Sequence, residues 1–235
     1  MNETVTQLRE HLKAVAPYPK GCVGFDGKAT MNGTAFFPGG DGLWKPQPGD
    51  EPEYPFGGTL VLGSDFGDVA WYDAQLESEN PWRQDIDGPT WRGLSNLFAL
   101  AGIARGEAFY TNAWPVLREG DEPVKGGIPG AQDRDFTARC IAFFKKTLEI
   151  MKPALIIPLG VAPTRFVGMA AGNAWANAST WKDIDAMPLA SAFGAKIVPV
   201  VHPSMPNRRH RVAAKTLAEE AAFLKRCGAS TRASA

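Results

Sequence analysis

The stretch TLVLGSDFGD, residues 59–68, joins a short apolar run to a turn that carries two carboxylates. The run has the length and the apolar content of a buried strand, and Gly63 ends it. Asp65 and Asp68 then follow at the carboxyl end of that strand. Ligands of open α/β sheets bind at the carboxyl ends of parallel strands, so this turn is a candidate functional site.

Further apolar runs of similar length follow this one: AFYTN at 108–112, ALIIPLG at 154–160 and KIVPVVHPS at 196–204. Helical spacing of apolar residues separates them, and Pro153 ends the second of these helices. Strands that alternate with helices predict an α/β fold with a parallel sheet covered on both faces. Pro199 cannot donate to a strand ladder, so the last run should form an edge strand or carry a distortion.

The rest of the chain divides by composition. Apolar residues between Val5 and Val15 have helical spacing, and residues 17–58 are rich in Pro and Gly, which favours an irregular segment over a core. We expect a last helix at about 211–227. The predicted domains are an N-terminal helix with its irregular segment at 1–58, an α/β domain at 59–227 and a flexible tail at 228–235.

Composition limits the classes of function. The 235 residues include 25 acidic and 25 basic side chains and 44% apolar residues, which is typical of a soluble globular chain. A formal net charge of zero excludes a strong global attraction to nucleic acid or anionic membrane, so a polyanion would have to be bound by a local patch. No apolar run approaches the roughly 18 residues of a membrane span. We expect a cytoplasmic protein with no membrane partner.

The three cysteines, Cys22, Cys140 and Cys227, lie far apart and form no CxxC pair. They predict neither a disulfide framework nor a four-thiolate metal site within one chain.

Polar residues end three of the expected strands: Asp65 the first, Asn112 the second and His202 the fourth. An acid, an amide and an imidazole at the carboxyl ends of one sheet would form a candidate active site.

The residues also resemble the uracil-DNA glycosylase superfamily over roughly residues 59–225. GSDFG stands at the place of the family's first motif and HPS at that of its second. Between them, GLSNLFALAGIARGEAFYTNAWP and FTARCIAFFKKTLEIMKPALIIPLG follow the family order and look closest to the bacterial thermostable, iron–sulfur type. The resemblance implies a three-layer α/β/α sandwich around a four-stranded parallel sheet of order 2-1-3-4.

The resemblance implies a metal-free, monofunctional DNA glycosylase that removes uracil or another damaged base in base excision repair. Asp65 would position the attacking water, His202 would stabilise the leaving base and Asn112 would read the base edge. Only Cys140 lies where the iron–sulfur type has a cluster ligand, so we expect no cofactor. We expect a monomer whose partner is DNA with the damaged base flipped out.

The remaining site residues also follow from the resemblance. The loop of the first motif and a nearby tryptophan would contact the base, and residues of the second motif and after it would contact DNA, with a methionine as minor-groove wedge and arginines on phosphates. The expected base contacts are Gly63, Ser64, Phe66 and Trp91, and the expected DNA contacts are Ser204, Met205, Arg208, Arg209 and Arg211.

Structural alternatives exist for these residues. Asp65 or Asp68 could cap the following helix, and His202 could be a structural histidine. Asn112 could bond neighbouring backbone, and Trp91 could belong to the core. The arginines could be a solvated helix start.

Two other functions compete with the glycosylase. The fold could serve as a catalytically silent module that binds nucleic acid or a nucleotide, or as a hydrolase of small nucleosides, since a fold does not fix a function.

Overall fold

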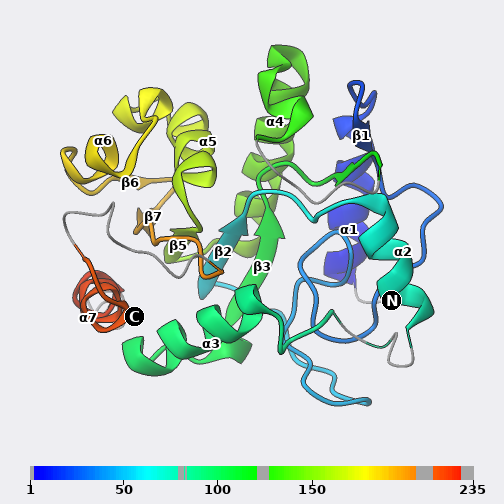
Figure 1. The fold of residues 1–235 in the computed structure, drawn as a ribbon, viewed down its shortest axis with the longest axis horizontal. Helices are drawn as coiled ribbons and strands as arrows, with labels where there is room; N and C mark the ends of the chain where they lie inside the picture. The colour runs from blue at the N-terminus through cyan, green and yellow to red at the C-terminus, as the bar shows by residue number, and fades with distance from the viewer. Residues whose placement is uncertain (1–2, 79–81, 83, 121–126, 205–213, 229–235) are drawn as a thin grey trace. The chain divides into compact units, whose positions relative to one another are not determined.

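The computed structural model describes residues 3–78, 82, 84–120, 127–204 and 214–228 (Figure 1). The α-helices are α1 Glu3–Leu12, α2 Val69–Glu77, α3 Pro89–Ala101, α4 Arg134–Met151, α5 Val161–Ala171, α6 Trp181–Asp185 and α7 Leu217–Gly228. The strands are β1 Cys22–Val23, β2 Thr59–Gly63, β3 Ala108–Asn112, β4 Leu117–Arg118, β5 Leu155–Pro158, β6 Ser191–Ala192 and β7 Ala195–Ile197. Short 3₁₀ helices are η1 Lys13–Val15, η2 Arg105–Glu107, η3 Pro129–Gln132 and η4 Ala174–Asn177.

The main sheet has five strands in the order β3-β2-β5-β7-β6. Strand β5 pairs in parallel with both β2 and β7, and its register with β2 runs from Thr59↔Leu155 to Leu62↔Pro158. Strand β6 pairs antiparallel with β7 and adds an edge. The chain is therefore α/β with a mixed sheet of five strands, rather than the four-stranded parallel sheet that we expected.

The run that contains Pro199 was expected to form an edge strand or to carry a distortion, and β6 borders β7 only at Ala195 and Lys196, before Pro199. Strand β7 ends at Ile197 and is bordered by β6, which the sequence did not predict. The N–H groups of Val198 and Val200 still donate to Ile156 O and Pro158 O at 2.9 and 3.0 Å. Successive N–H groups of extended backbone point to opposite sides, so the missing N–H of Pro199 interrupts no bond to β5.

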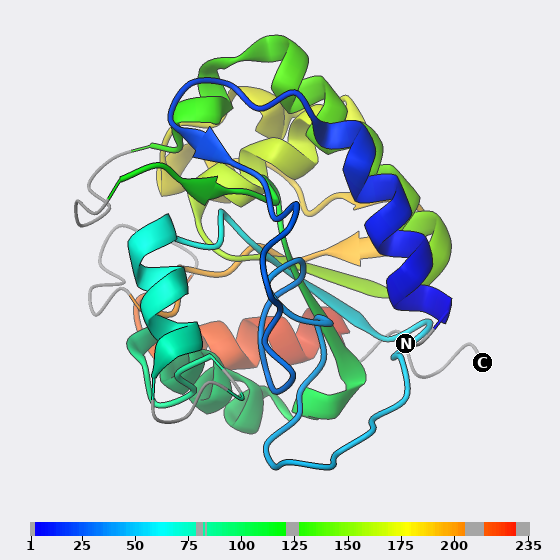
Figure 2. The same ribbon diagram turned by 90° about the vertical axis from the view of Figure 1, so that its right-hand side faces the viewer.

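The chain folds as two compact units. The first comprises Met1–Tyr54, Gly63–Gln84 and Tyr110–Met151, and the second comprises Pro55–Leu62, Asp85–Phe109 and Lys152–Ala235. In the first unit α1 packs on α4, as Figure 2 shows, and buries Val5, Leu8 and Leu12. The division at residues 58 and 227 stays a prediction.

In the second unit α3 packs against α7, and α5 packs against β5 and η4. Helix α3 begins with Pro89 at its first position and ends at Ala101, and Gly102 caps it with a φ of 73°, the left-handed conformation that glycine adopts readily. The apolar face of α3 is buried and consists of Trp91, Leu94, Leu97, Phe98 and Ala101.

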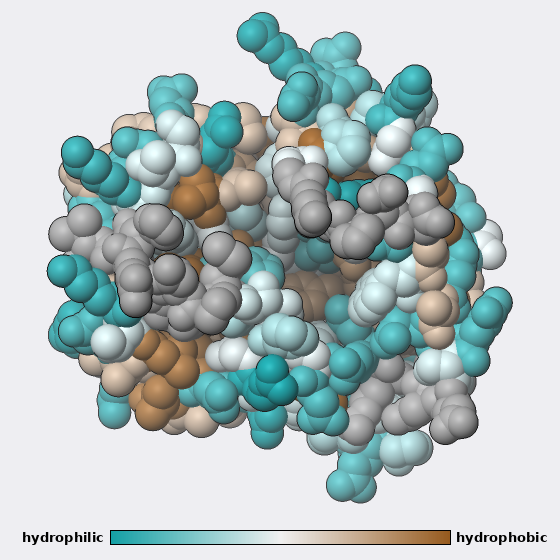
Figure 3. Space-filling view, viewed as in Figure 1, coloured by the Kyte–Doolittle hydropathy of each residue, from teal (hydrophilic) through white to brown (hydrophobic). Residues whose placement is uncertain are grey.

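The surface in the view of Figure 3 is mainly hydrophilic, with hydrophobic residues in small separate groups. None of the helices in the described part of the chain has both the length and the apolar character that a membrane span requires.

Candidate functional site

Asn112 ends β3 with a carboxamide that is almost completely enclosed. The residue is 4% exposed, and its Nδ2 has no hydrogen-bond partner among the described residues. A side chain at Gly63 would collide with Asn112 Oδ1, so glycine at the end of β2 makes the room for this amide. The structural alternative for Asn112, a bond from its side chain to neighbouring backbone, finds no support in these contacts, and its orphaned donor is a feature typical of a ligand site.

Backbone hydrogen bonds fix the segments that follow β2 and β3. Gly63 O accepts from Ala113 N at 2.9 Å, and Ser64 O accepts from Trp114 N at 3.0 Å. Ser64 itself is half-buried. Backbone hydrogen bonds therefore hold the first-motif loop next to the residues that follow β3.

Asp65 is held by an ion pair that the sequence did not predict. Arg118 Nε and Nη2 donate to Asp65 Oδ2 at 3.0 and 2.6 Å, and Gly67 N donates to Asp65 Oδ1 at 3.1 Å. Burial raises the pKa of the Asp65 carboxyl above its ordinary value, although Arg118 and the Gly67 N–H act in the opposite direction. The carboxylate is therefore desolvated and fixed, and it does not cap a helix.

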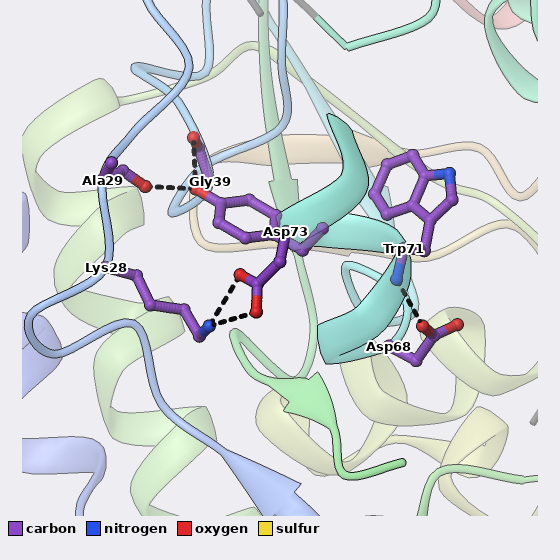
Figure 4. A network of polar contacts seen from close by, with 7 residues as sticks. Lys28, Ala29, Gly39, Asp68, Trp71 and Asp73 are labelled. Carbon is purple, nitrogen blue, oxygen red and sulfur yellow. Dashed lines mark hydrogen bonds and ion pairs between the residues drawn. The ribbon is translucent and has the colours of Figure 1, made fainter. Parts of the chain in front are cut away.

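Asp68 is the N-cap of α2. Its Oδ1 accepts from Trp71 N at 2.7 Å, which confirms the capping alternative for this residue (Figure 4). Further along α2, Asp73 pairs with Lys28 Nζ at 2.8 Å, and the Tyr72 hydroxyl donates to Ala29 O at 2.6 Å. These contacts attach α2 to the irregular N-terminal segment.

Phe66 does not lie open to a base. Its ring is 5% exposed and contacts Phe25, Trp71 and Tyr72 at centroid distances of 5.5, 6.0 and 5.4 Å. A side chain at Gly39 would collide with the same ring. Phe66 therefore anchors the first-motif loop to an aromatic cluster of the first unit, which corrects its expected role as a base contact.

In the second unit, His202 follows the β7 segment and is half-buried. Its Nδ1 lies 2.8 Å from Ser204 Oγ and accepts from Ser204 N at 3.4 Å. Burial lowers the pKa of the imidazole below its usual value. A neutral ring whose Nδ1 is an acceptor carries its proton on Nε2, which is then a hydrogen-bond donor.

Three elements lie close to the backbone around His202. Val201 N donates to Oε1 of Glu220 at 2.7 Å, and Glu220 is a completely buried carboxylate of α7. A side chain at Gly93 of α3 would collide with Pro203 O. At the start of α5, Gly160 has φ of 97°, and a Cβ there would lie 3.5 Å from His202 Cβ. The histidine is therefore attached to the core of the second unit.

The other expected contacts divide into two groups. Trp91 is 2% exposed on the buried face of α3, which supports the core alternative and removes it as a stacking surface. Met205, Arg208, Arg209 and Arg211 lie outside the described residues.

Among the described residues, no group of three or more His, Cys, Asp or Glu side chains gathers as metal ligands. Cys22 and Cys140 are buried free thiols, and burial raises the pKa of each.

Arg118 and Glu220 are the residues of these sites that sequence reasoning missed. Arg118 gives no local signal because its partner is distant in the chain. Glu220 does give one: it stands between Leu217 and Leu224 at helical spacing, so an acid falls on the apolar face of α7.

Comparison with known protein families gives an independent result. The Uracil DNA glycosylase superfamily matches residues 86–226, which is more than half of the chain and includes Asn112, Arg118 and His202. No protein with a curated description matches the chain. On the family match, this chain belongs to the uracil-DNA glycosylase superfamily.

Proposed function

We propose that the protein is a DNA glycosylase that hydrolyses the N-glycosidic bond of uracil or another damaged base in DNA. Membership of the superfamily supports the reaction class. The orphaned, buried Asn112 Nδ2 is the observation that carries the proposal, because it supports a base-reading role in this chain.

A buried donor without a partner costs about 1–3 kcal/mol, so Asn112 gains from a ligand that accepts its hydrogen bond. The C4 carbonyl of an extruded uracil is such an acceptor. Cytosine carries an amino group at C4, which is a donor and would leave Asn112 Nδ2 unpaired. The amide therefore favours uracil over cytosine.

His202 would act on the leaving base. In the tautomer that carries its proton on Nε2, the neutral ring can donate to a pyrimidine oxygen as negative charge develops there. Neutrality matters because the base leaves as an anion that the donor stabilises without a full proton transfer.

Asp65 would orient the attacking water. The water oxygen bonds to the anomeric carbon, and the electron pair of the N-glycosidic bond leaves with the base. A proton passes from the water to Asp65 and is released to solvent, and the base anion takes up a proton. One water is consumed, and the products are the free base and an abasic sugar.

The test is base release from labelled oligonucleotides that contain uracil, hypoxanthine or xanthine, in single and double strands. Asp65→Asn, His202→Ala and Asn112→Ala should each lower the rate on the order of 10²-fold or more. Asp73→Asn is the matched control, since it removes a carboxylate of another ion pair in the same unit. Rates within a few fold of wild type in all three variants would contradict the proposed roles.

Absence of release from every oligonucleotide, by protein that is folded, would favour a silent binding module of the same fold. Release from free nucleosides instead would favour the nucleoside hydrolase.

A further inference from the structure

The ion pair between Asp65 and Arg118 differs from ordinary surface pairs by its burial. The side chains of Arg118 and Asp65 are 13% and 8% exposed. The Lys28–Asp73 pair of the same unit is 21% and 45% exposed. Exposed ion pairs contribute little to the stability of the folded state. Loss of one partner from a buried pair, in contrast, leaves an uncompensated charge that is shielded from water.

Backbone contacts fix the main chain from which the guanidinium extends. Arg118 N donates to Gly67 O at 2.8 Å, and Phe66 N donates to Val116 O at 3.3 Å. The short strand β4 that contains Arg118 also pairs antiparallel with β1. The segment before and at Arg118 is therefore attached to the Asp65 loop through its backbone as well as through the side chain.

The Asp65 carboxylate keeps a defined number of free hydrogen-bond acceptor positions. A carboxylate offers about four lone-pair positions, two on each oxygen. Arg118 occupies Oδ2 with two donors, and Gly67 N occupies one position on Oδ1. Within the described part of the chain, the position that remains is one lone pair on Oδ1, which is enough for a single water.

Arg118 also lowers the pKa of the Asp65 carboxyl, which burial raises. Two other titratable groups lie near the Asp65 carboxyl. The charge of Asp68 raises the pKa of Asp65, and the Cys22 thiol of β1 interacts electrostatically with Asp65. Arg118 is the cation that acts against burial and against Asp68. Without it, the carboxyl would take up a proton more readily, and in that form it could not accept the proton of the attacking water.

We propose that Arg118 is a positioning residue for Asp65: its two-bond contact on Oδ2 fixes the carboxylate and leaves one Oδ1 lone pair for the attacking water. This inference rests on the proposed glycosylase function. Lysine cannot replace the arginine fully, because an ammonium carries the charge but lacks the planar fork.

The experiment compares Arg118→Lys, Arg118→Met and wild type in base release across pH. Arg118→Met should lower the rate of base release on the order of 10²-fold. The acidic limb of its pH–rate profile should move to higher pH, because the Asp65 carboxylate protonates more readily. Arg118→Lys should keep the limb near that of wild type with an intermediate rate. Lys28→Met, which breaks the more exposed pair, should change neither. An unmoved limb in Arg118→Met would overturn the proposal.

A second readout does not need activity. In Arg118→Met the pKa of Asp65 in the folded protein should rise further above its value in the unfolded chain. The folded state then binds more protons than the unfolded state over a wider range of pH. Its stability should then fall relative to wild type as pH rises from about 4. The double variant Arg118→Met/Asp65→Asn should lose this difference and should also fold if the single variant does not. A pH-independent difference between Arg118→Met and wild type would overturn the proposal.

The two readouts separate the two hypotheses. If wild-type protein releases no base while the unfolding data follow the expected pattern, the proposed function and the role of the water fail, but the electrostatic role of Arg118 stands. If wild type releases base and the limb does not move, the positioning role fails and the function stands.

Discussion

At the scale of single residues, His202 links stability to pH. Burial lowers the pKa of the folded imidazole, so below about 6.5, the value of an unfolded histidine, the unfolded chain binds more protons. The free energy of unfolding should therefore rise with pH through this window and fall on acidification. Urea unfolding at several pH values between about 5 and 8 measures it, for wild type and for His202→Asn.

The difference between these two proteins isolates the histidine from other titrating groups. It should favour the asparagine variant progressively as pH falls, because asparagine takes up no proton. A difference that is constant across the range would contradict a desolvated His202.

The chemistry of single residues was predictable where position alone decides it. Asp65, Asn112 and His202 stand after or at the ends of apolar runs in the sequence; in the structure Asn112 ends β3, Asp65 follows β2 in its turn, and His202 lies in the segment that continues beyond β7. The direction of Phe66 was not predictable, because the rings that enclose it come from elsewhere in the chain, such as Phe25. Arg118 could not be assigned to Asp65 for the same reason, since their contact joins residues 53 positions apart.

At the scale of elements, the crossing of α3 over the His202 segment depends on Gly93. Glycine in a helix is ordinarily worse than alanine by about 0.5–1 kcal/mol, so Gly→Ala in a helix should stabilise. A Cβ at Gly93 would collide with Pro203 O and lie 3.1 Å from Pro203 Cβ. We therefore expect Gly93→Ala to destabilise by about 1–3 kcal/mol and to lower base release through His202.

Gly106→Ala is the matched control, because a Cβ at that position in η2 would meet no atom within 4 Å. It should change the free energy of unfolding by less than about 0.5 kcal/mol. Chemical denaturation of both variants measures the contrast, and equal effects would contradict a close approach of α3 to Pro203.

Elements with a long and regular pattern were predictable, and short ones were not. Helices α3 and α4 follow apolar spacing over 13 and 18 residues, and β2, β3 and β5 follow continuous apolar runs. Helix α2 buries only Tyr72 along its length, so its sequence lacks an apolar face, and its cap and its contacts to Lys28 and Ala29 define it instead. Strand β6 has two residues and is defined by its pairing with β7.

At the scale of the whole molecule, charge balance decides how DNA could be bound. With 25 basic and 25 acidic side chains, the chain has no global field that attracts a polyanion. Affinity for DNA must then come from local phosphate contacts, and each such contact adds about 0.9 to the slope of log affinity against log salt. The slope therefore counts contacts.

The family resemblance implies that Arg208, Arg209 and Arg211 make such contacts. Replacing all three by glutamine should reduce the slope by roughly three times 0.9 and weaken binding at low salt most strongly. Fluorescence anisotropy with a uracil-containing oligonucleotide at several salt concentrations measures both. The control replaces Lys13, Lys146 and Lys225, all exposed, by glutamine and so changes the net charge equally. If local contacts bind the DNA, the control keeps the wild-type slope, whereas an equal loss in both variants would mean that net charge governs binding and that these arginines touch no phosphate.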